Sequence, residues 1–303
     1  MTNILLRADS SSKIGLGHIM RDLVLVKEFK KANISFACKN LKGNINHKVL
    51  EAGYNLEILK SNSKEELLKL IKKLKIDMLI IDHYKIDYKI QMYIKEKTGV
   101  KIFVVDDTYE KHQCDILLNP NLGADLKRYK NLVPKNCELR CGSKYTLLRD
   151  EFAKEKKRKK APKKKTIFLA MGGSDVGNIS LRVLKTLKAF KNVEVHIVTT
   201  SSNKNISSLK NYVKKRDGLH LHIDASNIAK LMAKSSFAIV SPSVILNEVY
   251  FMNLAFIAIK TAKNQHDIYK YLKNQNFLTL KKFNEKVLFK NCQQLLGSKY
   301  ENQ

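Results

Sequence analysis

The alternation of short apolar runs with amphipathic segments is the feature that most constrains the fold of this chain. The apolar runs have the length of strands, and they lie at Ile4–Ala8, Ile34–Cys38, Met78–Asp82, Ile102–Val105 and Ile116–Leu118. The amphipathic segments repeat apolar residues at the helical period, notably at Ile19–Lys31, Lys64–Leu74 and Tyr88–Lys97. Strands and helices that alternate in this way predict parallel sheets covered by helices, which is an α/β fold.

A strongly basic stretch at residues 154–165 interrupts the alternation. It contains one apolar residue, Ala161, and one proline, and such a block of charge is expected to repel itself and stay extended. After it a second series begins, with strands predicted at Thr166–Met171, Val193–Thr199, Leu219–Ile223, Phe237–Ser241 and Ala255–Ile259, and helices at Asn178–Phe190, Asn205–Lys215, Asn227–Lys234 and Ser243–Met252. We therefore predict two Rossmann-like domains, residues 1–152 and 166–303, joined by a basic linker at residues 153–165. A ligand is expected in a cleft between the carboxyl ends of the two sheets.

The charge of the chain suggests anionic ligands. It has 57 Lys and Arg against 28 Asp and Glu, a formal net charge of +29, which first suggests nucleic acid. The excess is mostly lysine spread along the solvated faces of helices, and no basic-aromatic interleaving or nucleic-acid-binding motif is present. We expect no specific nucleic-acid partner. A positive field would instead attract ligands such as nucleotide diphosphates.

Several classes of protein do not fit the sequence. The first strand begins almost at Met1, without a signal peptide before it, and no apolar run approaches the ~18 residues of a membrane span. The cysteines are odd in number and scattered, at Cys38, Cys114, Cys137, Cys141 and Cys292, which argues against a disulfide framework or a zinc site. We expect a cytoplasmic monomer that contacts no membrane and needs no metal or other cofactor.

The turn after the first strand is the first candidate for chemistry. Gly15 and Gly17 let the backbone approach a ligand closely, and the start of a helix favours an anion. The same position favours a neutral imidazole at His18, which is the form that a general base requires. Arg21 follows one turn later. The alternative is a polar histidine that caps or packs on the turn.

An equivalent turn opens the second half. Gly172, Gly173 and Ser174 follow the strand that ends at Met171, and their backbone and hydroxyl groups can donate hydrogen bonds to a diphosphate. The alternative is a plain tight turn.

A third candidate lies where another strand meets a helix. Ser243 is placed to cap that helix and meet a phosphate there. Glu248 is about one and a half turns further on, where a carboxylate can accept both hydroxyls of a ribose. A solvated surface glutamate is the alternative.

Polar residues also end two strands of the first half. Asp82, His83 and Tyr84 could position a sugar or a water molecule, although His83 could equally pair with Asp82 for structural reasons. Asp106 and Asp107 form a carboxylate pair that could bind a metal or a sugar hydroxyl. Because no third ligand is evident, we predict no metal.

Together these segments resemble the PseG family, the UDP-sugar hydrolases of pseudaminic acid biosynthesis. The resemblance rests on Gly15-x-Gly-His18-x-x-Arg21, Ile81-Asp-His-Tyr84, Cys141-Gly142 with Leu148-Arg149, Met171-Gly-Gly-x-Asp175 and Ser243-x-x-x-Asn-Glu248, and it extends to about Asn276. The linker is longer and more basic than is expected in this family, and the tail from about Leu278 to Gln303 extends past the usual end.

The resemblance implies a GT-B fold similar to that of MurG. It implies hydrolysis of UDP-2,4-diacetamido-2,4,6-trideoxy-β-L-altropyranose by attack of water at the anomeric carbon, with inversion and without a metal. By this carry-over His18 is the general base, Gly172–Ser174 and Ser243 hold the diphosphate, and Glu248 holds the ribose. The implied substrate and UDP contacts are Gly15, Gly17, Arg21, Tyr84, Arg149, Met171, Gly172, Gly173, Ser174, Ile223, Ser243, Asn247, Glu248, Asn264 and Gln265.

Two other functions fit parts of the sequence. A GT-B glycosyltransferase would share the UDP site but pass the sugar to an acceptor. Such an enzyme usually has an acceptor groove, often with an apolar patch that faces a membrane, and the first half shows no such patch. A basic nucleic-acid-binding protein would instead show affinity that falls steeply with salt.

Overall fold

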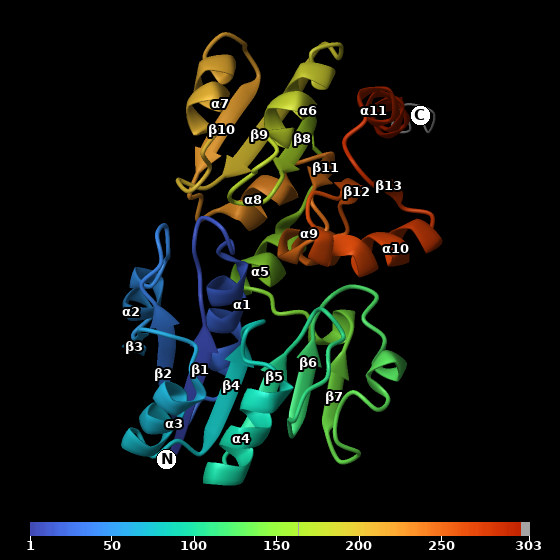
Figure 1. The fold of residues 1–303 in the computed structure, drawn as a ribbon. Coiled ribbons are helices and arrows are strands. Elements are labelled where there is room, and N and C mark those ends of the chain that lie inside the picture. The colour runs from blue at the N-terminus through green and yellow to red at the C-terminus, as the bar shows by residue number, and fades with distance from the viewer. Residues whose placement is uncertain (163, 298–303) are drawn as a thin grey trace. The chain divides into compact units, whose positions relative to one another are not determined.

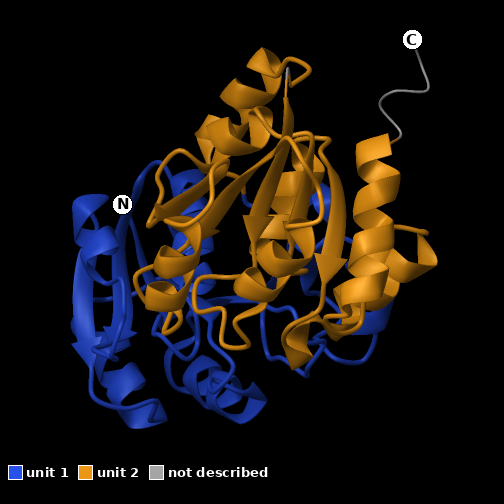
Figure 2. Cartoon of the chain, turned by 90° about the horizontal axis from the view of Figure 1, so that it is seen from above, with its two compact units in different colours: residues 1–147 blue, residues 148–303 orange. Residues whose placement is uncertain are grey.

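A computed structural model provides the structure of the protein and describes residues 1–162 and 164–297. The chain divides into two compact units, residues 1–147 and residues 148–303 (Figure 2). Each unit contains one β-sheet with helices packed against it (Figure 1). The predicted α/β class, with two Rossmann-like units, is confirmed.

Unit 1 contains a seven-stranded sheet with the order β3-β2-β1-β4-β5-β6-β7, and all of its strand pairs are parallel. Its strands are β1 (Thr2–Ala8), β2 (Ala32–Lys39), β3 (Asn55–Leu59), β4 (Met78–Asp82), β5 (Lys101–Val105), β6 (Ile116–Asn119) and β7 (Glu138–Cys141). Its helices are α1 (Gly17–Leu25), α2 (His47–Glu51), α3 (Lys64–Lys73) and α4 (Tyr88–Thr98), with short 3-10 segments η1 (Val26–Glu28), η2 (Leu126–Tyr129) and η3 (Ser143–Tyr145).

Local signals in the sequence explain where the helices of unit 1 begin and end. Ser63 precedes α3 and accepts a hydrogen bond from the Glu66 backbone N–H at 3.1 Å, and α4 ends at Gly99, whose φ is 66°. The predicted helix at Ile19–Lys31 is too long. The chain tightens after α1 into η1, where the Phe29 N–H donates to the Val26 carbonyl at 3.1 Å, so that β2 can begin at Ala32.

Unit 2 contains a six-stranded sheet with the order β10-β9-β8-β11-β12-β13, again with parallel pairs throughout. Its strands are β8 (Lys165–Ala170), β9 (Val193–Thr199), β10 (Leu219–Ile223), β11 (Phe237–Val240), β12 (Ala255–Ile259) and β13 (Leu278–Leu280). Its helices are α5 (Asp150–Arg158), α6 (Ile179–Leu187), α7 (Ile206–Val213), α8 (Ile228–Ala233), α9 (Val244–Phe251), α10 (His266–Asn274) and α11 (Glu285–Gly297), with the 3-10 segment η4 (Lys263–Gln265).

The expectation that the basic stretch stays extended is wrong for its first part. Residues 150–158 form α5, with Asp150 and Glu151 in the first turn and three basic residues in the last, so both ends suit the helix dipole. Phe152 is fully buried and anchors the helix within unit 2. The structure divides the chain between Leu147 and Leu148, ahead of this helix.

The end of the chain, as far as it is described, belongs to unit 2. β13 extends the sheet beside β12, and Leu288, Cys292 and Leu296 of α11 pack into the same core as α6. Residues 298–303 of the predicted tail lie outside the described residues.

In both sheets the strand order reverses next to the first strand of the unit. The reversal lies between β1 and β4 in unit 1 and between β8 and β11 in unit 2. Ligands of open α/β sheets bind beyond the carboxyl ends of the strands at such a point. The candidate turns predicted from the sequence follow these strands.

Candidate active site

The candidate catalytic histidine lies at the point of strand reversal in unit 1. Gly15, with φ of 94°, closes a tight turn with Ser11, whose carbonyl accepts from the Gly15 N–H at 2.8 Å. The chain then enters α1, so that His18 lies in its first turn, which no side chain caps. β1 and β4 are in register at Ala8 and Asp82, and this places the end of β4 beside the turn.

Asp82 holds His18 and Arg21 together. The Nδ1 atom of His18 lies 2.7 Å from one carboxylate oxygen of Asp82. Arg21 donates from Nε to the other oxygen at 2.6 Å, and its Nη2 contacts the first oxygen as well. All three residues are buried, with His18 9% exposed.

The electrostatics of this cluster fix the state of the carboxylate. Burial opposes ionisation of Asp82, but Arg21 and His18 outweigh it and hold the pKa of this carboxyl well below its usual range. Because an ionised carboxylate only accepts hydrogen bonds, Nδ1 of His18 carries the proton. Arg21 Nη2 also lies 3.2 Å from Nδ1, but both atoms are then donors, and the shorter contact to Asp82 decides the tautomer. The lone pair of neutral His18 is therefore on Nε2.

Tyr84 and Asp107 extend the cluster toward solvent. The Tyr84 hydroxyl donates to Asp107 at 2.9 Å, and Arg21 lies 3.5 Å from the same carboxylate. The rings of Tyr84 and His18 meet edge to face, with their centroids 5.3 Å apart. Tyr84 is 46% exposed, so part of its side chain is accessible to solvent.

The neighbouring polar residues have structural roles. His83 pairs with Asp9, at 3.0 Å from Nε2 to the carboxylate, and not with Asp82. The two adjacent carboxylates Asp106 and Asp107 have different partners. Asp106 accepts from the Tyr129 hydroxyl at 2.7 Å inside the unit, while Asp107 belongs to the Tyr84 cluster.

The two predicted phosphate turns of unit 2 lie beside each other. The Ser241 N–H donates to the carbonyl of Ala170 at 3.1 Å, which joins the end of β8 to the turn before α9. Gly172 has φ of 84°, which favours glycine, and a Cβ at Gly173 would lie 3.0 Å from the Thr200 side chain. Within the described residues, the N–H groups of Gly172, Gly173 and Ser174 donate no hydrogen bond.

The starts of two helices differ in their free donors. Asp175 accepts from the N–H groups of Ile179 and Ser180 at 2.8 and 3.0 Å, so the start of α6 is already capped. Ser243 occupies the N-cap position of α9, but its side chain makes no capping bond and instead lies 3.2 Å from the Ser241 hydroxyl. The first turn of α9 is therefore the one that keeps donors for an anion.

Glu248 is buried, at 7% exposure, so the alternative of a solvated surface glutamate is wrong. Its carboxylate lies 3.2 Å from Arg149, which also pairs with Glu151 at 2.7 Å. Burial raises the pKa of Glu248 to about 7, although Arg149 acts in the opposite direction.

The other predicted contacts of unit 2 differ in burial. Asn247 is buried next to Glu248, Met171 is buried after β8, and Ile223 is half-buried at the end of β10. Asn264 is exposed. Gln265 is buried, and its side-chain oxygen accepts from the Thr261 N–H at 2.7 Å and so holds the loop after β12.

No family model matches the chain. A protein of Campylobacter jejuni named UDP-2,4-diacetamido-2,4,6-trideoxy-β-L-altropyranose hydrolase is 43% identical over 274 residues, which cover 90% of this chain and 97% of that protein. The chain belongs to this hydrolase family. The resemblance drawn from the sequence motifs is confirmed.

One further relative is similar in sequence, and solved structures of other proteins are similar in fold. Uncharacterized protein MJ1062 of Methanocaldococcus jannaschii is 30% identical over 279 residues, which are 88% of this chain but only 57% of that protein. MurG of Acinetobacter baumannii superposes with a TM-score of 0.66 at 12% identity, over 98% of this chain and 91% of that one. MnaA of Staphylococcus aureus, solved with UDP, gives a TM-score of 0.62 at 13% identity, over 98% of this chain and 88% of that one. The likeness to these two solved structures shows the GT-B fold.

The described residues contain neither a metal-binding cluster nor a membrane-spanning helix. No group of three His, Cys, Asp or Glu side chains is placed to hold a metal ion. No helix there is long and apolar enough to cross a membrane.

The sequence did not show that Asp82 is the hydrogen-bond partner of His18. Asp82 was one of three polar residues at a strand end, with no sign of which would face His18. The usable signal is that β1 and β4 are neighbours at the point of reversal, because the last residue of β4 then faces the turn that follows β1.

Proposed function

We propose that this protein hydrolyses UDP-2,4-diacetamido-2,4,6-trideoxy-β-L-altropyranose to UDP and the free sugar, with inversion at the anomeric carbon. Membership of the hydrolase family supports the substrate. The observation that carries the chemistry is the contact between His18 Nδ1 and ionised Asp82, because it leaves Nε2 unprotonated as a general base.

The residues of unit 1 activate water. His18 takes a proton on Nε2 as the water oxygen bonds to the anomeric carbon, and Asp82 stabilises the imidazolium that forms. Arg21 keeps Asp82 ionised and oriented. Tyr84 lies against His18 and contacts the sugar, and Gly15 and Gly17 allow the substrate to approach the backbone closely.

The residues of unit 2 bind UDP and accept the charge of the leaving group. As the bond from the anomeric carbon to the diphosphate breaks, its electrons pass to the diphosphate oxygen. The N–H groups of Gly172–Ser174 and the start of α9 at Ser243 stabilise that charge. Glu248 accepts the ribose hydroxyls and Arg149 positions its carboxylate. The backbone near Ile223 contacts uracil. The diphosphate or the sugar is contacted by Met171, Asn247, Asn264 and Gln265.

The proposed reaction needs no metal or other cofactor, since UDP leaves readily and requires little acid assistance. We further propose a cytoplasmic monomer without a specific nucleic-acid partner. The scattered cysteines agree with a reducing compartment.

Incubation of the protein with its UDP-sugar in ¹⁸O-labelled water, without any acceptor, tests this function. We expect UDP release, with the label on the anomeric oxygen of the free sugar. NMR of the first turnovers, before the anomers equilibrate, should show the inverted anomer. A glycosyltransferase would release no UDP under these conditions, and that result would reject the hydrolase function.

A further inference from the structure

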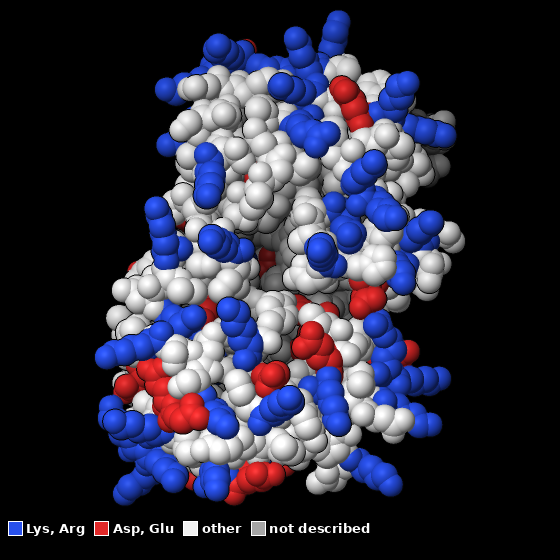
Figure 3. Space-filling view, viewed as in Figure 1, with Lys and Arg blue, Asp and Glu red and all other residues white. Residues whose placement is uncertain are grey.

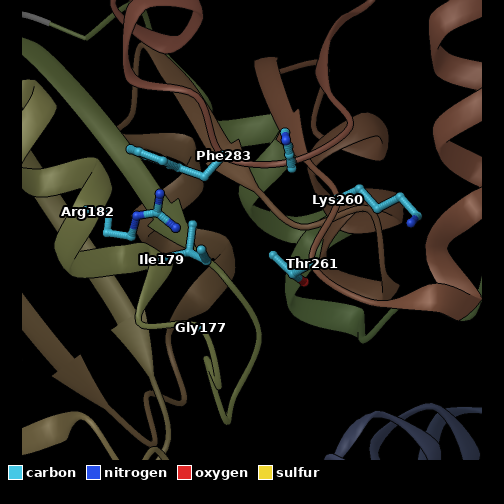
Figure 4. Close-up of a pocket in the computed structure, with 7 residues that line it drawn as sticks. Gly177, Ile179, Arg182, Lys260, Thr261 and Phe283 are labelled. Atoms are coloured by element: carbon cyan, nitrogen blue, oxygen red, sulfur yellow. The ribbon is translucent and has the colours of Figure 1, made fainter.

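A cavity of about 370 Å³ lies in unit 2, and the residues that line it differ from those assigned to UDP (Figure 4). It opens between the start of α6, the end of β12 and the segment after β13. The residues that line it are Gly177, Ile179, Arg182, Lys260, Thr261, Lys282 and Phe283. This volume is within the range of sites for small molecules.

The lining is strongly cationic. Arg182, Lys260 and Lys282 contribute three positive charges and no acidic residue lines the cavity. Within the described residues, none of these three side chains forms an ion pair or a hydrogen bond. In Figure 3, Lys and Arg side chains gather over the part of unit 2 that contains β13 and α10. An anion that entered the cavity would therefore meet unneutralised charge.

The geometry of Arg182 fits a phosphate. Its guanidinium carbon lies 4.2 Å from the centre of the Phe283 ring, and the two groups lie close together in Figure 4. Contact with an aromatic ring holds a guanidinium in place, and its N–H fork matches the oxygens of a phosphate. Two lysines on neighbouring segments supply further charge, which suits a dianion better than a single carboxylate.

The N–H groups at the start of α6 are not the donors that an anion in this cavity would meet. Asp175 already accepts the N–H groups of Ile179 and Ser180, so an anion here would be bound by side chains. The proposed UDP contacts instead use the free N–H groups of Gly172–Ser174 and the start of α9. None of the residues assigned to UDP lines the cavity.

We propose that this cavity is a second binding site, which takes the phosphate group of a small phosphorylated molecule while UDP occupies its own site. Arg182 binds two phosphate oxygens, Lys260 and Lys282 neutralise the remaining charge, and Phe283 contacts the apolar part of the molecule. The site belongs to unit 2 alone.

Calorimetric titration with inorganic phosphate, with and without saturating UDP, tests the proposal. The variants R182Q and K282Q remove one charge each at similar size, and K281Q removes the charge of an exposed neighbour that does not line the cavity. We expect wild type and K281Q to bind phosphate equally, with or without UDP. We expect R182Q and K282Q to weaken phosphate binding by about tenfold, because each loses a charge-assisted contact, while the Kd of UDP stays the same.

Three results would overturn the proposal. Phosphate binding could be lost when UDP is added, or the affinity for UDP could fall in R182Q and K282Q. Either result would show that these cations belong to the UDP site. Equal weakening by K281Q would reduce the effect to general surface charge. Absence of phosphate binding in wild type would remove the site. Circular dichroism of each variant checks its fold, and because turnover is not measured, the outcome is independent of the hydrolase activity.

Discussion

At the scale of residues, one carboxylate determines what His18 can do. Asp82 accepts from both His18 and Arg21, and it is ionised although it is almost completely buried. Its charge orients the imidazole and stabilises the imidazolium that proton transfer would create. The buried guanidinium of Arg21 in turn needs this anion.

Replacement of Asp82 by Asn should therefore reduce turnover. The amide keeps the shape of the carboxylate but loses the charge, so we expect kcat to fall about 100-fold or more. UDP affinity should change by less than about twofold, because the proposed UDP contacts lie in unit 2. Steady-state kinetics and calorimetry measure the two quantities.

Asp107→Asn is the matched control. Asp107 contacts Tyr84 and Arg21 but not His18, so its loss should lower kcat by less than about tenfold. Equal losses in the two variants would argue against a specific role of Asp82 in orienting His18.

Glu248 links stability to pH. Burial raises its pKa in the folded protein to about 7 from an unfolded value near 4.5. The folded state therefore binds more protons than the unfolded state in this range, and stability falls as pH rises from about 4.5 through about 7. Glu248→Gln removes this effect, so its melting temperature should rise relative to wild type across that interval. A difference between the two proteins that is constant with pH would contradict the assignment.

The sequence predicted the candidate residues better than their pairing. His18, Arg21, Asp82 and Glu248 are predicted because each lies at or soon after a junction between a strand and a turn or helix. Arg149 is predicted only because it matches a family motif. The ion pairs between them depend on strand register and side-chain direction, which have no local signal. His83 illustrates this, since the sequence left open a pairing with the adjacent Asp82 and the structure pairs it with Asp9.

At the scale of elements, the strands were the most predictable part. β4, β9, β10 and β12 have the predicted limits. β4 and β12 are nearly continuous apolar runs, as buried parallel strands are, whereas β9 and β10 alternate apolar and polar residues. α5 was missed because its helix period carries only one large buried side chain, Phe152, within a long run of charge. β7 has four residues in which charged and apolar side chains alternate, and β13 has only three residues, so neither shows the apolar run that predicted β6 and β11.

α11 should be necessary for the stability of unit 2. Leu288 is fully buried in the core shared with α6, whereas the adjacent Val287 is 43% exposed. Leu288→Ala should lower the free energy of unfolding by about 2–5 kcal/mol, and Val287→Ala by less than about 1 kcal/mol. Chemical denaturation measures both. Similar small losses would show that the helix is not part of the core.

At the scale of the whole molecule, charge should affect the encounter with substrate. The net charge of +29 gives a long-range attraction for a UDP-sugar, and this attraction is screened by salt. We expect kcat/KM to fall several-fold between about 50 and about 500 mM NaCl, with little change in kcat. Binding of uridine, which carries no charge, is the control and should not respond. If kcat/KM does not change, charge does not contribute to the encounter.

The His18→Ala variant tests whether His18 is the general base of this UDP-sugar hydrolase. Turnover of UDP-2,4-diacetamido-2,4,6-trideoxy-β-L-altropyranose should fall by about 10²–10⁴-fold relative to wild type. The Kd of UDP, measured on the same preparation, should stay within about twofold. Unchanged turnover in His18→Ala would show that His18 is not the general base.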